Sequence, residues 1–142
     1  MDQRISLITL GVGDLARSRA FYARLGWKEV DPNQAEVAFF QMNGLGLGLF
    51  SRDSLAEDAH LPPAGSGFSG VTLAINVASL EAVDAALAEA ERVGARILKP
   101  GEKVFWGGYS GYFADPDGHA WEIAHNPFWT VHPDGRTELK AS

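Results

Sequence analysis

The strongest candidate for a catalytic or ligand-binding residue in this sequence is a single carboxylate, Glu122. Glu122 lies within residues 119–125, a mostly apolar run that predicts a strand. Side chains alternate between the two faces of a strand, so Glu122 is on one face and its neighbours Trp121 and Ile123 are on the other. A carboxylate on a partly apolar surface is costly unless it is paired or hydrogen-bonded. Two interpretations stay open: Glu122 binds a ligand or acts as a general base, or it is a structural carboxylate. In the second case its candidate partners are Thr9, Thr72 and Arg52.

A second candidate lies at Trp106-Gly107-Gly108-Tyr109. A tryptophan beside flexible glycines can stack on a planar or cationic ligand. It can equally be a core residue or a dimer contact. We expect Trp106 and Tyr109 to bind a ligand, Phe50 to form the floor of the cavity, and Arg52 to reach its rim.

The four histidines are weaker candidates. His60 and His132 lie in segments that read as a linker and a tail, and His119 and His125 share the strand face opposite Glu122. Each is ordinarily a solvated or hydrogen-bonded side chain. His125 is the exception to watch, because it lies where the strand should fray. The chain has no cysteine, which excludes disulfides and thiolate chemistry.

The strands and helices that would position these residues belong to a sequence unit that occurs twice in the chain. The run Leu7-Ile8-Thr9-Leu10-Gly11-Val12 reappears as Gly70-Val71-Thr72-Leu73-Ala74-Ile75, and each copy continues into a helix that ends at a glycine. A unit repeated at this length cannot cover its own apolar face and packs with its copy. We expect a first module over about residues 4–51, a linker over 52–68, a second module over 69–127 and a tail over 128–142.

Local signals predict the elements of each module. Asp14 can cap the first helix, and residues 80–93 form the second. Asn43-Gly44 and Asp115-Pro116-Asp117-Gly118 read as turns between strands. The predicted strands cover residues 5–12, 27–30, 36–42, 45–50, 70–77, 95–98, 109–114 and 119–125.

The strand period also predicts a hollow. In the first module Leu45, Leu47 and Leu49 share a face, which leaves Gly46, Gly48 and Phe50 on the other. In the second module the large residues Val71, Leu73, Ile75 and Val77 oppose Gly70, Thr72, Ala74 and Asn76. If the bulky faces pack under the helices, the small residues line a cup with room for a ligand. Alternatively, the glycines only allow the sheet to curve.

The length and net charge of the chain limit the number of domains and the classes of partner. The chain has 142 residues, enough for one compact domain, and a formal net charge of −6 from 12 basic and 18 acidic residues. Without a basic stripe we expect no nucleic-acid partner. No apolar run approaches a membrane span, and the start has no apolar signal region. We therefore expect no membrane partner and a cytoplasmic location.

Two motifs, in this order along the chain, carry a resemblance to a known family. They are Gly11-Val12-Gly13-Asp14-Leu15-Ala16-Arg17-Ser18-Arg19-Ala20-Phe21-Tyr22 and Phe113-Ala114-Asp115-Pro116-Asp117-Gly118-His119-Ala120-Trp121-Glu122-Ile123. With the repeat, they resemble the vicinal oxygen chelate superfamily of glyoxalase I, bleomycin-resistance proteins and extradiol dioxygenases. The resemblance covers about residues 4–127. It implies an α+β fold of two tandem βαβββ modules, whose curved mixed sheets form a cup with helices on the outer face. It also places Trp106 at the pocket mouth.

The resemblance also implies where a metal would bind. Enzymes of this superfamily hold a divalent ion with one ligand from the first strand and one from the last strand of each copy. The matching positions here are Leu7, Gly48, Gly70 and Glu122. Three of these residues have no donor side chain, and a lone carboxylate cannot hold a divalent ion. We expect no metal and no cofactor.

These observations predict a metal-free homodimer that binds a small organic molecule in its cup, either as a sequestering protein of the bleomycin-resistance kind or as another kind of binding module. The predicted ligand-binding residues are Thr9, Gly48, Phe50, Arg52, Gly70, Thr72, Trp106, Tyr109 and Glu122. The alternative is a lyase, isomerase or dioxygenase of the glyoxalase kind, in which Glu122 is the base or a metal ligand. A third possibility is a purely structural dimer, whose cup would be filled by side chains.

Overall fold

The computed structural model of the protein describes residues 1 and 3–140 and divides the chain into two compact units, residues 1–69 and 70–142. Unit 1 combines a mixed sheet with two helices, and unit 2 combines a mixed sheet with one. This mixed α+β architecture confirms the predicted fold class. Within the described residues, no helix is both long and apolar enough to span a membrane.

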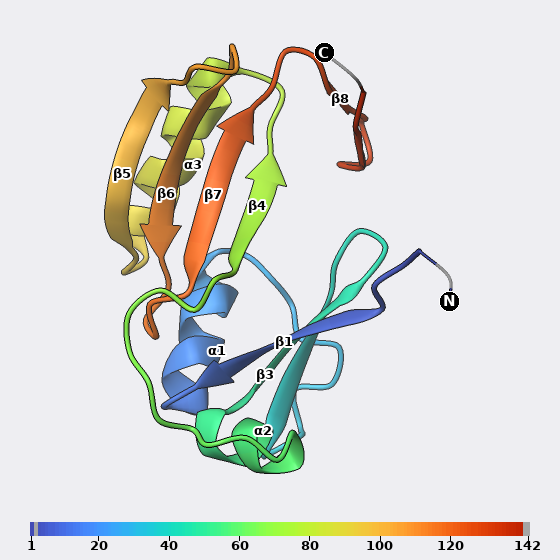
Figure 1. Ribbon diagram of the computed structural model, residues 1–142, viewed down its shortest axis with the longest axis vertical. Helices are drawn as coiled ribbons and strands as arrows, with labels where there is room; N and C mark the ends of the chain where they lie inside the picture. Colours follow the sequence, from blue (N-terminus) through green and yellow to red (C-terminus); the bar gives the residue numbers. More distant parts are fainter. Residues whose placement is uncertain (2, 141–142) are drawn as a thin grey trace. The chain divides into compact units, whose positions relative to one another are not determined.

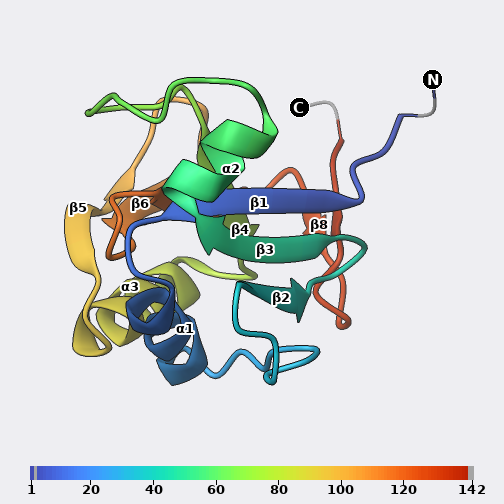
Figure 2. The same ribbon diagram turned by 90° about the horizontal axis from the view of Figure 1, so that it is seen from below.

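Unit 1 contains a three-stranded sheet and two helices. In chain order these are β1 (Leu7–Val12), α1 (Leu15–Arg24), β2 (Val37–Gln41), β3 (Gly46–Ser51) and α2 (Arg52–Asp58). Figure 2 shows the strands side by side in the order β1-β3-β2. The central β3 is parallel to β1 and antiparallel to β2.

The core of unit 1 forms between α1 and one face of this sheet. Asp14 caps the helix by accepting a hydrogen bond from the amide of Arg17 at 3.1 Å. The buried helix residues are Ser18, Phe21 and Tyr22. They pack with Phe40, Leu47 and Leu49, each of which is at most 2% exposed. The alternation predicted for residues 45–50 is therefore present, with Leu47 and Leu49 in the core and Leu45 half-buried.

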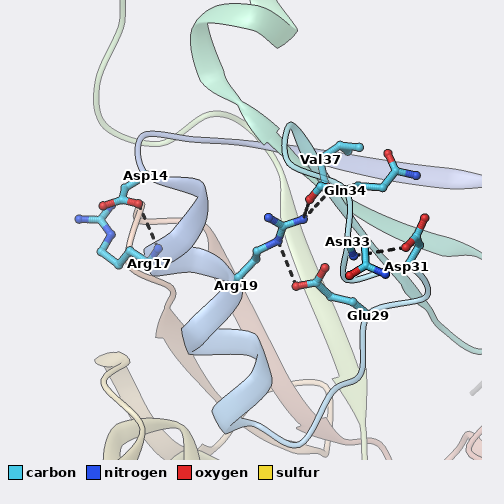
Figure 3. A network of polar contacts seen from close by, with 8 residues as sticks. All are labelled: Asp14, Arg17, Arg19, Glu29, Asp31, Asn33, Gln34 and Val37. Carbon is cyan, nitrogen blue, oxygen red and sulfur yellow. Dashed lines mark hydrogen bonds and ion pairs between the residues drawn. The ribbon is translucent and has the colours of Figure 1, made fainter.

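The segment between α1 and β2 is held by a polar network instead of a strand. The guanidinium of Arg19 pairs with Glu29 at 3.1 Å and donates to the carbonyls of Gln34 and Val37 (Figure 3). The strand predicted over residues 27–30 is reduced to a single bridge between Glu29 and Phe40. A side chain thus supplies contacts that a sheet ladder supplies elsewhere.

The segment expected to be a linker begins with α2. Ser51 caps this helix through the amide of Ser54, and Asp53 lies in its first turn, where the helix dipole favours a negative charge. The helix ends before His60, which has a positive φ of 58°. Residues 61–70 then run as exposed chain to the second unit.

Unit 2 repeats the pattern more completely. Its elements are β4 (Thr72–Asn76), α3 (Leu80–Arg92), β5 (Arg96–Lys103), β6 (Tyr109–Ala114) and β7 (Ala120–His125), followed by the short β8 (Thr130–Val131) and β9 (Thr137–Glu138). Figure 1 shows the order β5-β6-β7-β4, with α3 covering one face. β8 and β9 pair as a small hairpin in the tail.

The core of unit 2 lies between α3 and the bulky sheet face. Val83, Leu87 and Ala90 are the buried residues of the helix. They face a sheet whose inner residues include Phe113 and Trp121, stacked with ring centroids 6.2 Å apart. Val71 was predicted on this face, but it is 59% exposed because β4 begins only at Thr72. β5 extends five residues beyond the predicted end at residue 98, through two irregularities in its pairing with β6.

The strand registers correct the alignment of the two copies. Gly48 pairs with Thr9 in unit 1, whereas Glu122 pairs with Ala74 in unit 2. Thr9 therefore corresponds to Ala74 and not to Thr72, and the counterpart of Leu7 is Thr72 and not Gly70. The helix caps agree, because Asp14 and Ser79 each follow their first strand at this corrected spacing.

Candidate functional site

The turn before β7 places Glu122. The side chain of Asp115, 4% exposed, accepts hydrogen bonds from the amides of Asp117 and His119, both at 2.9 Å. Gly118 then adopts the positive φ of 86° that the predicted turn requires. The turn fixes the register of the hairpin, in which Tyr112 lies directly opposite Glu122.

Packing against α3 settles which way Glu122 faces. β7 is an inner strand, between β4 and β6, and its Trp121 and Ile123 are 4% and 2% exposed. Because side chains alternate, the half-buried Glu122 lies on the opposite, uncovered face. Ala74 and Tyr112 are its cross-strand neighbours on that face.

Tyr112 lies opposite Glu122 in the strand pair, and its phenol responds to the carboxylate. Burial raises the pKa of the Tyr112 phenol, and the charge and hydrogen bond of Glu122 raise this pKa further, while Lys99 opposes them. The Lys99 ammonium lies 6.0 Å from the centroid of the Tyr112 ring and pairs with Glu102 at 3.0 Å. The structural carboxylate interpretation thus has a partner, but a different one from Thr9, Thr72 or Arg52.

A hollow of about 660 Å³ opens beside Glu122 on this face. Its volume lies in the range of small-molecule sites. Alanines from β4 and β7 leave the space, aromatic rings supply the apolar wall, and amides and two charged groups supply the polar atoms. The lining residues are Ala74, Asn76, Trp106, Glu122, Ala124, Asn126, Phe128, Trp129 and Lys140.

A smaller hollow of about 330 Å³ shares Trp106 and Glu122 with the first. It lies towards β5 and includes Lys99, Lys103 and Tyr112. Glu122 and Trp106 therefore border both spaces, which makes them the central residues of the candidate site.

Trp106 is positioned by the turn between β5 and β6. The amide of Gly107 donates to the carbonyl of Val104 at 3.0 Å, and Gly107 has a φ of 93°. A Cβ atom on Gly108 would overlap the Trp106 ring, so only glycine lets the ring lie where it does. The two glycines predicted to give this tryptophan freedom instead hold it in place.

The tail forms part of the same wall. The Phe128 ring lies 3.3 Å from the position a Cβ atom would take on Gly107, and the indole of Trp129 donates to the carbonyl of Lys140 at 3.2 Å. The amide of Phe128 donates to the side chain of Asn126 at 2.9 Å. The aromatic residues of the tail therefore pack back on their own unit.

Other predicted site residues of unit 2 lie elsewhere. The hydroxyl of Tyr109 donates to Asp84 of α3 at 2.8 Å, so this side chain belongs to the helix side of the sheet, and Tyr112 takes the place expected for it. Gly70 lies before β4 and is exposed. Thr72 lies two residues before Ala74 in β4, so its side chain is on the same face of the strand as that of Ala74. It is not among the residues that line the larger hollow.

The predicted residues of unit 1 form a separate group. Thr9 and Gly48 are paired in the sheet, and Phe50 lies two residues further on the same face. The guanidinium Nε of Arg52 donates to the carbonyl of Pro63 at 2.8 Å. A Cβ atom on Gly48 would lie 3.2 Å from the Phe39 ring and 3.3 Å from the Thr9 hydroxyl, so this position is already covered.

The donor set does not fit a divalent metal. In unit 1 the two family positions hold Leu7 and Gly48; in unit 2 the corrected pair is Thr72 and Glu122. One carboxylate and one hydroxyl are too few ligands for a divalent site. Throughout residues 1 and 3–140, no group of three or more His, Cys, Asp or Glu side chains could hold an ion.

Sequence reasoning predicts part of this lining. The strand period places Ala74 and Asn76 on the face that lines the cup, without naming them as ligand-binding residues, and Ala124 follows from the same period as Glu122. Tyr112 could have been found, because the predicted Asp-Pro-Asp-Gly turn places it opposite Glu122. The contributions of Asn126, Phe128, Trp129 and Lys140 depend on how the tail folds back, for which the sequence has no periodic signal.

Comparison with known proteins identifies the family. The model of the Glyoxalase/Bleomycin resistance protein/Dioxygenase superfamily matches residues 4–123, and the chain belongs to this superfamily. No functionally curated protein matches the sequence.

Solved structures agree with the family assignment. A glyoxalase-related enzyme from Fulvimarina pelagi is 38% identical, with a TM-score of 0.89 over 98% of this chain and 99% of that one. A glyoxalase/bleomycin resistance protein/dioxygenase from Nocardioides is 25% identical, with a TM-score of 0.72 over 88% and 84%. The lactoylglutathione lyase of Agrobacterium tumefaciens, 22% identical with a TM-score of 0.69 over 91% and 98%, shares the fold.

Proposed function

We propose that this protein binds a small organic molecule in the hollow of unit 2 without the help of a divalent metal. The observation that carries the proposal is a 660 Å³ space whose wall is aromatic and whose floor holds one half-buried carboxylate, Glu122. Such sites combine apolar walls with a few polar groups that fix orientation. The purely structural alternative is disfavoured by this open space.

A binding screen with a blocked variant tests the proposal. Small aromatic compounds of neutral, anionic and cationic character are screened by ligand-observed NMR against the wild type and against Ala74→Leu, which adds volume to the floor of the hollow. We expect hits that bind the wild type and lose affinity in Ala74→Leu. Mass spectrometry of molecules that co-purify with the protein supplies native candidates. A screen without hits, or hits indifferent to Ala74→Leu, would contradict the proposal.

The metal-free part has its own test. Elemental analysis of protein purified without chelators should find far less than one zinc, nickel, iron or manganese per chain, because Leu7, Gly48 and Thr72 supply no strong ligand. Near-stoichiometric metal that is lost in Glu122→Gln would overturn this part of the proposal.

An enzyme of the glyoxalase kind is the second candidate. It is supported by the position of the Tyr112 phenol opposite Glu122, which could orient a carboxylate that accepts a proton, and by the similarity to the glyoxalase-related enzyme from Fulvimarina pelagi. If Glu122 is a base, the wild type should catalyse exchange of solvent deuterium into a bound carbon acid. Glu122→Gln should abolish the exchange and keep binding within a few-fold. Binding without exchange favours the first proposal.

We also propose that two copies of the chain form a homodimer. In unit 2, Val71 is 59% exposed and Phe105 is completely exposed, and β4 and β5 are the edge strands of its sheet. Exposed apolar residues and open edges are typical of surfaces that find a partner. Light scattering should give twice the chain mass of 15.3 kDa at micromolar concentration. A monomer mass would defeat the proposal.

A further inference from the structure

Each of the three aromatic residues of the larger hollow has a contact that restricts its ring. The Trp106 ring lies over Gly108, the Phe128 ring lies against Gly107, and the Trp129 indole is fixed by its hydrogen bond to the Lys140 carbonyl. Rings that are already ordered lose little conformational freedom when a ligand binds between them. They present a preformed aromatic wall.

A carboxylate lies on the same hollow. Glu122 is half-buried and lies between Ala74 and Tyr112 on the sheet. An ionised carboxylate has about four acceptor positions, more than a single neighbouring phenol can occupy. Its negative charge is therefore available to the hollow.

Aromatic rings together with a carboxylate form the kind of site that attracts an organic cation. The faces of aromatic rings carry negative electrostatic potential, and an alkylated ammonium group is attracted to them without needing hydrogen-bond acceptors. A simple anion would instead be repelled by the Glu122 carboxylate and by the negative potential of these ring faces. We propose that the hollow of unit 2 binds the quaternary or multiply methylated ammonium group of its ligand between Trp106, Phe128, Trp129 and Glu122. This inference rests on the proposed binding function and gives its ligand a chemical class.

The volume adds a second requirement. A trimethylammonium group is much smaller than 660 Å³, so the ligand must have a further body. The amides of Asn76 and Asn126 line the same space and can hydrogen-bond that body. A methylated ammonium headgroup on a polar or aromatic skeleton fits both features.

One residue opposes the cation and so sharpens the test. The ammonium of Lys140 also lines the hollow and donates to the Thr130 hydroxyl at 3.2 Å. Its charge should weaken the binding of another cation. Removing it should therefore strengthen cation binding, whereas in an anion site the same change would weaken binding.

The decisive experiment compares choline with 3,3-dimethylbutan-1-ol, which has the same shape with carbon in place of the charged nitrogen. Calorimetric or NMR titration of the full chain should show choline binding about 10-fold or more tightly than the alcohol. Glu122→Gln should lower choline affinity about 10-fold and leave the alcohol within about 2-fold. Lys140→Met should raise choline affinity several-fold, and Glu89→Gln, an exposed carboxylate of α3, should change neither.

The outcomes separate this inference from the function beneath it. Equal affinity for choline and the alcohol, unchanged choline affinity in Glu122→Gln, or no choline binding at 100 mM would each overturn the cation proposal. Neutral or anionic compounds that bind in the screen above and lose affinity in Ala74→Leu would at the same time leave the binding function standing. Thermal melting of every variant checks that a lost affinity is not a lost fold.

Discussion

The two units differ most at one equivalent position in the middle of each sheet and at its two cross-strand neighbours. In unit 1 the central residue of the sheet is Gly48, with Thr9 on one side and Phe39 on the other. In unit 2 the corresponding residue is Glu122, with Ala74 and Tyr112 beside it. The Phe39 ring and the Thr9 hydroxyl lie over the glycine, whereas the alanine leaves space and the tyrosine phenol responds to the carboxylate.

The difference shows how one fold can carry a site in only one of its copies. Around these residues both units pair the last strand in the same way, with a parallel partner on one side and an antiparallel partner on the other, so the local backbone does not distinguish them. The side chains at three neighbouring positions distinguish the two units. In unit 1 the large Phe39 ring lies beside Gly48, which has no side chain, and in unit 2 the ionisable Glu122 takes the place of that glycine. The chemistry that each unit can offer therefore depends on these side chains and not on the repeated fold.

The largest expected effect comes from giving unit 1 the residue of unit 2. Gly48→Glu would force a carboxylate against the Phe39 ring and the Thr9 hydroxyl in a buried position. Overpacking should lower the free energy of unfolding by about 1–3 kcal/mol. Urea unfolding followed by circular dichroism measures the loss.

A double variant shows whether the Phe39 ring is the cause. Phe39→Ala makes room, so Gly48→Glu should cost less in that background than in the wild type, with a coupling of about 1 kcal/mol or more. An unchanged urea midpoint for Gly48→Glu alone would mean that this position is not closed, and the contrast between the units would fail.

The next effect concerns binding and separates two roles of Glu122. If the carboxylate binds the ligand, Glu122→Gln should lose about 1.5–3 kcal/mol of binding free energy, or one to two decades in affinity, while the melting temperature stays nearly constant. If Glu122 is structural, the melting temperature should change and the affinity should not. Calorimetry with a ligand found in the screen decides between them.

Trp106→Ala is the companion variant. A stacking role predicts weaker binding with little loss of fold, because Trp106 is only half-buried. Unchanged affinity in both Glu122→Gln and Trp106→Ala would exclude the hollow as the working site.

The fold was largely predictable from the sequence, and the site only in part. Caps such as Asp14, turns such as Asp115-Pro116-Asp117-Gly118 and the alternation around Leu47 and Leu49 are local signals, and the structure contains them. The strand expected at 27–30 failed because Arg19 holds this segment from a distant part of the sequence. No local pattern reports such a contact.

The alignment of the copies shows a second limit. Matching apolar runs by their letters put Gly70 opposite Leu7, while the distance from strand to helix cap puts Thr72 there. A register error of two residues keeps every side chain on the same face, so the face assignments survived it. Tyr109 was different: choosing it over Tyr112 is a shift of three residues, which changes the face.

A smaller effect concerns the Tyr112 phenol. Its pKa is raised by burial first and then by Glu122, with Lys99 acting in the opposite direction. Glu122→Gln should therefore lower this pKa, and Lys99→Met should raise it. Absorbance titration near 295 nm in a Tyr109→Phe background measures it, after subtraction of the curve of Tyr109→Phe/Tyr112→Phe, which keeps only Tyr22. Since the folded pKa lies above the unfolded value of about 10, the stabilisation is complete below pH 10 and is lost as the pH rises through the folded pKa. A titration curve that is identical with and without Glu122 would remove the link between the two residues.

The smallest expected effect comes from Tyr109, on the other face of β6. Its hydroxyl donates to Asp84, and this hydrogen bond is the main cause that raises the Tyr109 pKa. The pair is exposed to water, where such contacts contribute little to stability. Tyr109→Phe should leave the melting temperature nearly unchanged and the ligand affinity unchanged, whereas Tyr112→Phe should weaken binding, because only Tyr112 lies opposite Glu122. Two tyrosines three residues apart on one strand thus form a matched pair that differs in face. If Tyr109→Phe weakened binding as much as Tyr112→Phe, the site would not be confined to the face that carries Glu122.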